Sequence, residues 1–239
     1  MSELDKLKVK IFLDGAELDA IRNAVKNEPM VKGFTTNPSL MRKAGVKDYA
    51  AFAKEALAAA GGLPISFEVF SDEFEDMERQ ARVIASWGES AYVKIPITNT
   101  KGESSCPMIK RLADGGVKMN VTAIFTVEQV KETAAALNAP VPAIVSVFAG
   151  RIADTGRNPE PMMKECSNIL NGLSKAELLW ASSRELLNVF QAEWSGCHII
   201  TVTKDIVSKL KLYGKDLSEY SLETVRVFYD DASAAGLKL

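Results

Sequence analysis

Two ionisable side chains lie inside short apolar segments of this sequence. Lys94 stands at the centre of the run 91–97, and Glu68 stands inside the run 65–70. Burying an ammonium group without a partner is unfavourable, and burial lowers the pKa of a lysine because it disfavours the charged form. A neutral amine is a nucleophile that forms a Schiff base with a ketone. The pattern therefore suggests covalent chemistry at Lys94, although a lysine can also extend its charged end to solvent or join a structural ion pair.

Other polar residues recur near the ends of the segments that read as strands. In a barrel enzyme, side chains at the carboxyl ends of the strands build the active site. Uncompensated burial of a charge is costly, so polar groups at seven strand ends are difficult to explain by structure alone. Taken singly, Asp14 could cap a helix, Asn37 could belong to a turn and Thr122 could be an ordinary strand residue. The set contains Asp14, Thr35, Thr36, Asn37, Glu68, Lys94, Asn120, Thr122, Ser146, Arg151, Ser182 and Arg184.

These residues must be positioned by strands that alternate with helices. Short apolar runs begin about 30 residues apart, which is the length of one βαβ unit. Several runs are continuously apolar, as in a parallel sheet that is covered on both faces. The predicted strands are residues 9–14, 33–37, 65–70, 91–97, 118–125, 143–148, 178–182 and 198–202.

Amphipathic helices separate the strands. Apolar side chains in residues 49–60 fall on one helical face, and Thr126 with Gln129 matches a capping box. Eight strands and eight helices in one domain, residues 1–220, predict a single (β/α)8 barrel. The alternative is an open doubly wound sheet, which needs a GxGxxG turn after the first strand, and residues 14–17 do not provide one.

A further segment, residues 221–239, follows the eighth unit. Ser221 is placed to cap a helix there. A helix beyond a closed barrel must bury its apolar stripe on its own barrel or on a neighbouring subunit. We therefore expect a C-terminal helical extension in contact with another subunit. Its stripe consists of Leu222, Val225, Phe228 and Tyr229.

The composition excludes several classes of protein. The chain has 239 residues, of which 47% are hydrophobic, so it can bury a substantial core. A net charge of −2 gives no basic excess for nucleic acid. No apolar stretch reaches the roughly 18 residues of a membrane span, and the first residues lack the core of a signal peptide. The three widely spaced cysteines indicate free thiols in a cytoplasmic protein.

Metal and histidine chemistry are both disfavoured by the sequence. There is one histidine, His198, and there is no CxxC or HExxH motif for a protein-held zinc ion. A histidine-based catalytic triad would depend on that single residue. We therefore expect a site that works without a metal or another cofactor.

Seven stretches, in the same order along the chain, resemble the transaldolase family, in the short branch that also contains fructose-6-phosphate aldolase. The most specific are the Thr-Thr-Asn-Pro motif that ends at Pro38 and the Val-Lys-Ile-Pro motif around Lys94. Together the matching stretches cover nearly the whole predicted barrel. They are residues 12–14, 33–40, 67–69, 93–96, 120–122, 146–152 and 181–184.

The resemblance implies a role for each matched residue. Lys94 would attack C2 of a ketose, and Asp14 would take the proton of the C4 hydroxyl so that the C3–C4 bond breaks. Glu68 would relay protons through a water held by Thr122. Arg151 and Arg184, with Ser182, would bind a phosphate, because guanidinium geometry suits oxyanions. The residues implied in substrate binding are Thr36, Asn37, Asn120, Ser146, Phe148, Arg151, Ser182 and Arg184.

The resemblance also bears on the type of reaction. The transaldolase branch has glutamate and phenylalanine where the free-aldolase branch has glutamine and tyrosine, and this chain has Glu68 and Phe148. We therefore expect transfer of a dihydroxyacetone unit between sugar phosphates. Free aldol cleavage remains an alternative, and so does a non-catalytic sugar-phosphate-binding barrel. The branch further implies a homo-oligomer, a pentamer or decamer, with no nucleic-acid or membrane partner.

Two polar loops depart from the family pattern. Residues 99–105 and 155–161 have no close match in it, and they lie where substrate specificity is set. A ketose with another anionic end, such as a sulfonate, could use the same two arginines.

Overall fold

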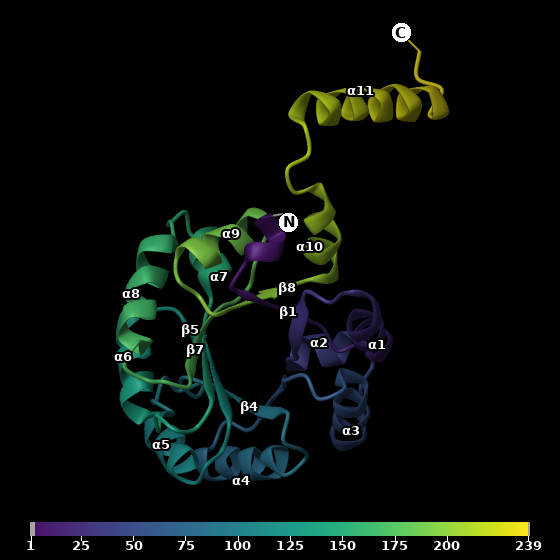
Figure 1. Ribbon diagram of the computed structural model, residues 1–239. Coiled ribbons are helices and arrows are strands. Elements are labelled where there is room, and N and C mark those ends of the chain that lie inside the picture. The colour runs from purple at the N-terminus through teal and green to yellow at the C-terminus, as the bar shows by residue number, and fades with distance from the viewer. Residues whose placement is uncertain (1–2, 239) are drawn as a thin grey trace. The chain divides into compact units, whose positions relative to one another are not determined.

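Residues 3–238 are described by a computed structural model, in which eight parallel strands form a closed barrel (Figure 1). Neighbouring strands follow chain order, and the last strand closes the ring by pairing with the first. The predicted (β/α)8 barrel is therefore confirmed. The strands are β1 (Lys10–Asp14), β2 (Val31–Thr35), β3 (Ile65–Glu68), β4 (Ala91–Pro96), β5 (Met119–Ile124), β6 (Ala143–Val147), β7 (Ala176–Trp180) and β8 (Ile199–Val202).

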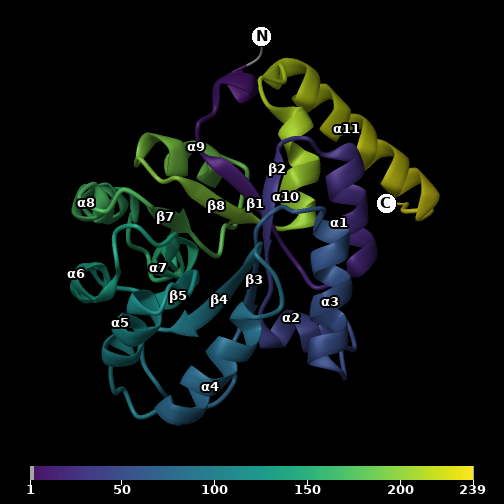
Figure 2. The ribbon, with the colours of Figure 1, turned by 60° about the horizontal axis from the view of Figure 1, so that its bottom comes forward.

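Helices surround the strands on the outside of the barrel (Figure 2). Their sequences carry the signals that start them: Thr126 and Gln129 form the predicted capping box, and the Asn37 side chain caps the helix that begins at Pro38. The α-helices up to residue 209 are α1 (Leu18–Asn27), α2 (Pro38–Lys43), α3 (Tyr49–Ala60), α4 (Phe74–Ala85), α5 (Cys106–Asp114), α6 (Val127–Ala136), α7 (Ala149–Asp154), α8 (Glu160–Leu170), α9 (Leu187–Trp194) and α10 (Lys204–Lys209). Two 3-10 helices, η1 (Glu3–Lys6) and η2 (Leu210–Leu212), are also present.

Three strands differ from the prediction by two residues at an end. β2 ends at Thr35 and not at residue 37, because Asn37 is already committed to capping α2. β7 lies two residues earlier than predicted, and Ser182 is not extended but has a φ of 62°. β3 ends at Glu68 and not at Phe70. β2 also begins two residues earlier than predicted, at Val31, and the other strand ends lie within one residue of their predicted positions.

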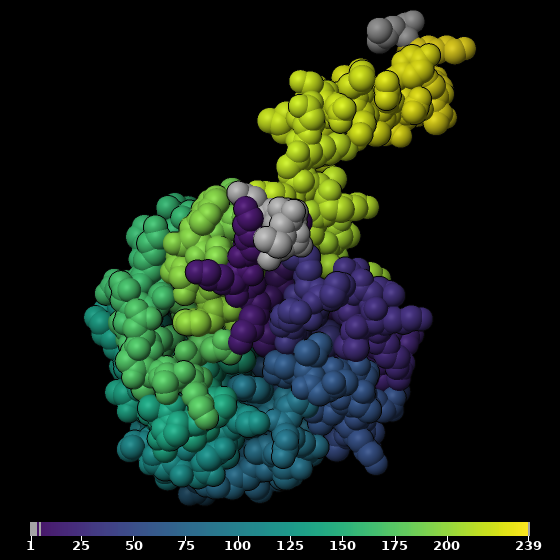
Figure 3. Space-filling view, viewed as in Figure 1, coloured from purple at the N-terminus to yellow at the C-terminus, as the bar shows by residue number. Residues whose placement is uncertain are grey.

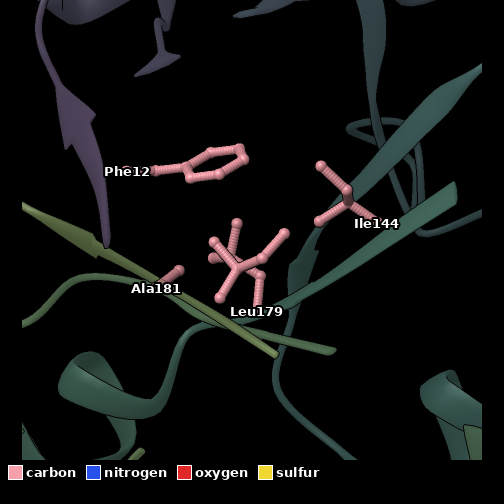
Figure 4. Packing of buried hydrophobic residues seen from close by; sticks show 5 residues of the cluster. Phe12, Ile144, Leu179 and Ala181 are labelled. Carbon is pink, nitrogen blue, oxygen red and sulfur yellow. The ribbon is translucent and has the colours of Figure 1, made fainter. Parts of the chain in front are cut away.

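Apolar side chains fill the barrel below the polar residues. Phe12, Ile144, Leu179, Ala181 and Ile199 form a buried cluster, and the labelled members converge from opposite sides of the ring (Figure 4). Because side chains alternate along a strand, the next inward position after such a cluster residue lies two residues further on. In β1 and β6 that position carries a polar residue. The apolar cluster therefore lies next to the polar layer, on the side of the amino ends of the strands.

The chain divides into two compact units, up to Val207 and from Ser208 onward. In the second unit, α11 spans Leu217–Ala234, and the Asp216 carboxylate caps it by accepting from the backbone N–H groups of Ser218 and Glu219. The predicted cap at Ser221 is wrong, since Ser221 lies inside the helix. The apolar residues of the predicted stripe are exposed in the single chain.

Side chains fill the gaps between the ribbons of the barrel unit, as the space-filling view shows (Figure 3). Over residues 3–238, no helix combines the length and the apolar character that crossing a membrane requires.

Candidate active site

Lys94 and Glu68 form a buried ion pair inside the barrel. Their positions are register partners on β4 and β3, and Lys94 Nζ lies 3.1 Å from Glu68 Oε2. Nζ also donates to the backbone carbonyl of Thr36 at 3.2 Å. The lysine is only 8% exposed, so its charged end does not extend to bulk solvent. The amine is thus held at one place, with a carboxylate close enough to exchange a proton with it.

Asp14 ends β1 and faces the same interior. Its Oδ1 accepts from Thr35 Oγ1 at 2.7 Å. Burial raises the pKa of Asp14, although the positive charge of Lys94 and the Thr35 hydrogen bond partly offset this. The residue does not cap α1, whose N-cap is Glu17. A carboxylate with a raised pKa is a stronger base than an exposed one, which suits proton abstraction.

Asp14 also lines a cavity of about 380 Å³ beside β1 and α1. Lys43 and Lys204 contribute to its wall, and the remaining lining is mainly apolar. Lys94 is not part of this lining.

A hydrogen-bonded row crosses the barrel next to the lysine. Ser146 Oγ donates to Asn120 Oδ1 at 2.6 Å, and Asn120 Nδ2 donates to Ser66 Oγ at 3.0 Å. These bonds fix the orientation of the Asn120 amide. Ser66 is absent from the predicted set. Its signal in the sequence is a small polar residue two positions before Glu68, which places it on the same inward face.

Thr122 and Thr36 are buried but differ in their bonding. The Thr122 hydroxyl has no hydrogen-bond partner within the described part of the chain. A buried hydroxyl of this kind is costly unless water or a substrate satisfies it. The Thr36 hydroxyl donates to the Ser66 carbonyl at 2.8 Å, and Asn37 Oδ1 accepts from the Leu40 backbone N–H at 3.0 Å. For these two, only part of the side chain remains for a substrate.

The two arginines lie at the ends of β6 and β7. Arg151 is on α7, with its guanidinium carbon 4.9 Å from the centre of the Phe148 ring. Arg184 lies in the segment after β7, and its Nε and Nη2 donate to the two carboxylate oxygens of Asp154 at 3.0 and 2.6 Å. Asp154 is absent from the predicted set. Its position three residues after Arg151 puts both on one helical face.

The loop after β4, residues 99–105, has a defined structure. Thr98 and Ser104 form an antiparallel bridge, and Asn99 Oδ1 accepts from the backbone N–H groups of Lys101 and Glu103. Asp72, in the loop after β3, accepts from the backbone N–H and the hydroxyl of Thr100, each at 2.7 Å. The two loops are therefore joined to each other.

His198 has a structural contact, since its Nδ1 accepts from the Leu178 backbone N–H at 3.1 Å. Among residues 3–238, no three or more His, Cys, Asp or Glu side chains are grouped so that they could hold a metal ion. The fold and the polar interior define a (β/α)8 barrel with a lysine and two carboxylates in its interior.

Comparison with known proteins gives the family. The sequence profile described as "Transaldolase/Fructose-6-phosphate aldolase" matches residues 11–238. A "Probable transaldolase" from Thermoanaerobacter sp. is 34% identical over 232 residues, covering 97% of this chain and 100% of the relative. Another from Thermoplasma acidophilum is 35% identical over 211 residues, covering 87% of this chain and 90% of the relative. The chain belongs to the transaldolase/fructose-6-phosphate aldolase family.

Solved structures of low sequence identity share the fold. The crystal structure of KGPDC from Streptococcus mutans aligns with a TM-score of 0.56 at 11% identity, over 84% of this chain and 90% of that one. A putative phosphonomutase from Burkholderia cenocepacia aligns with a TM-score of 0.57 at 12% identity, over 96% and 97% of the two chains. At such identities the likeness concerns the barrel alone.

Proposed function

We propose that this protein is a transaldolase, which moves a dihydroxyacetone unit from a ketose phosphate to an aldose phosphate through a Schiff base on Lys94. The observation that carries the proposal is the buried Lys94–Glu68 pair, 3.1 Å apart, in the same barrel interior as the Asp14 carboxyl. An amine can attack a ketone only after losing its proton, and Glu68 is near enough to receive it.

The proposed reaction begins with attack of Lys94 Nζ on C2 of the ketose. Loss of water from the resulting carbinolamine gives an iminium ion. Asp14 then takes the proton of the C4 hydroxyl, the O–H electrons form the carbonyl of the leaving aldehyde, and the C3–C4 bond electrons pass to C3. The iminium accepts this electron pair as an enamine.

The second half of the reaction reverses these movements on another aldehyde. The enamine carbon attacks the acceptor carbonyl, and Asp14 returns its proton to the new alkoxide. Water then hydrolyses the iminium and frees Lys94. Glu68 and a water bound to the Thr122 hydroxyl move the protons when the carbinolamine forms and breaks down. The unpartnered Thr122 hydroxyl supports this role.

The remaining polar groups are proposed to bind the substrate. Asn120 and Ser146 contact the dihydroxyacetone unit from a fixed orientation. Asn37 contributes its amide nitrogen, because its oxygen caps α2. Arg151 and Arg184 hold the anionic end of the sugar. A sulfonate-bearing ketose is a second candidate substrate for the same arginines.

Phe148 favours transfer over free aldol cleavage. Its ring packs against Phe125, with the ring centres 5.5 Å apart, and carries Arg151 on its face. A phenyl ring cannot donate a proton to the three-carbon enamine, whereas a tyrosine hydroxyl can. We propose that the enamine therefore persists until an acceptor aldehyde arrives.

Borohydride trapping tests this proposal. The protein is treated with fructose 6-phosphate and borohydride, and the mass of the intact chain and of its peptides is measured. We expect one added three-carbon or six-carbon unit on the peptide that contains Lys94, and none in Lys94→Ala. Lys118 is the matched control, because it is only half-buried and donates to the Glu89 carbonyl at 2.7 Å. Label on Lys118, or no label at all, would show that the barrel is not a Schiff-base enzyme of this kind.

The same proposal includes a homo-oligomer, a pentamer or decamer, in the cytoplasm. The proposed oligomer is supported by the exposed apolar residues of α11, which a second copy of the chain would cover.

A further inference from the structure

Arg184 is held by three hydrogen bonds that leave only part of its guanidinium free. Nε and Nη2 donate to the two oxygens of Asp154, and Nη1 donates to the Ser182 carbonyl at 2.9 Å. A guanidinium has five N–H groups in a fixed plane, so two remain for another acceptor. Within the described part of the chain these two have no partner. Asp154 and Ser182 thus fix the direction in which the two remaining N–H groups of Arg184 point.

The segment that carries these partners is tightly packed. The Gly150 backbone N–H donates to the Ala181 carbonyl at 3.1 Å. A side-chain carbon at Gly150 would lie 1.6 Å from the Ser182 carbonyl oxygen, which is the oxygen that Arg184 uses. The amino end of α7 therefore touches the segment after β7. Asp154, at the other end of α7, bridges to the same segment through Arg184.

Asp154 also influences Arg151. Its hydrogen bonds to Arg184 come first among the causes that hold its pKa below the ordinary aspartate value, and the charges of both arginines act in the same direction. Asp154 is therefore ionised at neutral pH. Arg151 itself has no carboxylate within 4.0 Å among the described residues. The two guanidinium groups and one carboxylate together carry one net positive charge.

We propose that Asp154 is a positioning residue that tunes the charge preference of the anion site: it orients Arg184 and reduces the preference of the two arginines for a dianion over a monoanion. The inference rests on the proposed function, because it assumes that the two arginines bind the anionic end of the substrate. A dianion placed against Arg184 interacts with the Asp154 carboxylate about twice as strongly as a monoanion in the same place. The attraction to the two arginines doubles as well, so the carboxylate only reduces the margin by which a phosphate dianion binds more tightly than a sulfonate of the same shape.

A pair of unreactive ligands tests the effect of charge. Glucitol 6-phosphate and 6-deoxy-6-sulfoglucitol lack a carbonyl group, so they bind without forming a Schiff base. At pH 8 the phosphate carries about two negative charges, since its second pKa is about 6, and the sulfonate carries one. Calorimetric titration of the full chain gives the ratio of the two dissociation constants.

We expect Asp154→Asn to shift this ratio toward the phosphate by about 2–5-fold, which corresponds to one half-exposed charge interaction. Loss of orientation weakens both ligands alike and cancels in the ratio. Asp154→Glu retains the charge, so it should weaken both ligands but leave the ratio as in the unaltered protein. Asp76→Asn is the matched control, because Asp76 is similarly exposed and pairs with Arg79 on α4. This control should change neither constant.

Two results would overturn the proposal. One is an unchanged ratio in Asp154→Asn, whatever the two affinities, which would show that the carboxylate does not tune the charge preference of the site. The other is failure of the unaltered protein to bind either polyol, which would show that the arginines form no anion site. Borohydride labelling of Lys94 reads out the proposed function separately, since it needs no anion selectivity.

Discussion

Asp14 combines burial, a hydrogen bond and a neighbouring positive charge. Burial dominates, so its pKa lies above the ordinary aspartate value. A buried carboxylate costs folding free energy, and such a residue is retained where function needs it. Asp14 is also where the sequence left two interpretations open, a helix cap or a base. The structure removes the cap, because Glu17 occupies that position.

Asp14→Asn should keep Schiff-base formation and lose turnover. The amide can still accept from Thr35 but cannot take a proton, and loss of a positioned general base costs about 10²–10⁴-fold. Turnover is measured by the transfer of dihydroxyacetone to an acceptor, and Schiff-base formation by borohydride labelling. Near-normal turnover would mean that another group is the base.

The same variant should be more stable than the unaltered protein at neutral pH. A raised pKa means that the folded state binds the proton more tightly than the unfolded chain, so stability falls as the carboxyl ionises with rising pH. Asparagine does not ionise. The gain in Tm should therefore grow as the pH rises above about 4, since the unfolded pKa is near 3.9. A gain that shrinks over this range would contradict the assignment of burial as the dominant effect.

Glu68 and Phe148 decide between transfer and free aldol chemistry in the proposed reaction. Replacing both, as Glu68→Gln with Phe148→Tyr, adds a hydroxyl that can protonate the enamine and removes a carboxylate that can exchange protons. We expect more free dihydroxyacetone and less transfer. Product analysis with fructose 6-phosphate, with and without erythrose 4-phosphate, gives both rates. Rapid release of dihydroxyacetone by the unaltered protein, independent of acceptor, would reverse the assignment.

The strands and the segments that connect them to helices differ in how well the sequence predicts their functional residues. Lys94 and Glu68 could be predicted because an ionisable residue in an apolar strand is itself unusual. Asp154 could not, because an aspartate in a short helix has no such contrast, and its partner Arg184 lies 30 positions away in sequence. Ser182 likewise reads as the end of a strand, yet its φ is 62° and its carbonyl lies against Gly150, a residue far away in sequence.

Gly150 is the residue on which that contact depends. Any side chain there would meet the Ser182 carbonyl, which is backbone and cannot move aside. Gly150→Ala should destabilise the fold by about 1–3 kcal/mol or distort the arginine site, as overpacking does. Gly172→Ala is the control, because no atom lies within 4 Å of the added carbon. Denaturant unfolding compares the two. Equal stability of both variants would show that the segment shifts freely.

At the scale of the whole molecule, contacts within one chain do not account for the stability of α11. It has 18 residues and no buried side chain, and an isolated helix of that length is only marginally stable in water. Its apolar residues would be covered in an assembly. Deleting residues 217–239 should therefore shrink the particle seen by light scattering. As a control, Leu222→Ala should weaken assembly less than the deletion does. A full-length protein that is monomeric at working concentration would refute the proposed assembly.

The hydrogen bonds that join the loops after β3 and β4 affect how aldehydes can enter and leave the barrel. Asp72 and Thr100, with Lys101 and Glu73 at 2.9 Å, fasten these loops together without a substrate. Binding then incurs no cost for ordering them. In the proposed transfer, the first aldehyde must leave and the second must enter while the three-carbon unit stays attached. A lid would have to open twice in each cycle, whereas a fixed wall on this side lets the aldehydes exchange by diffusion alone.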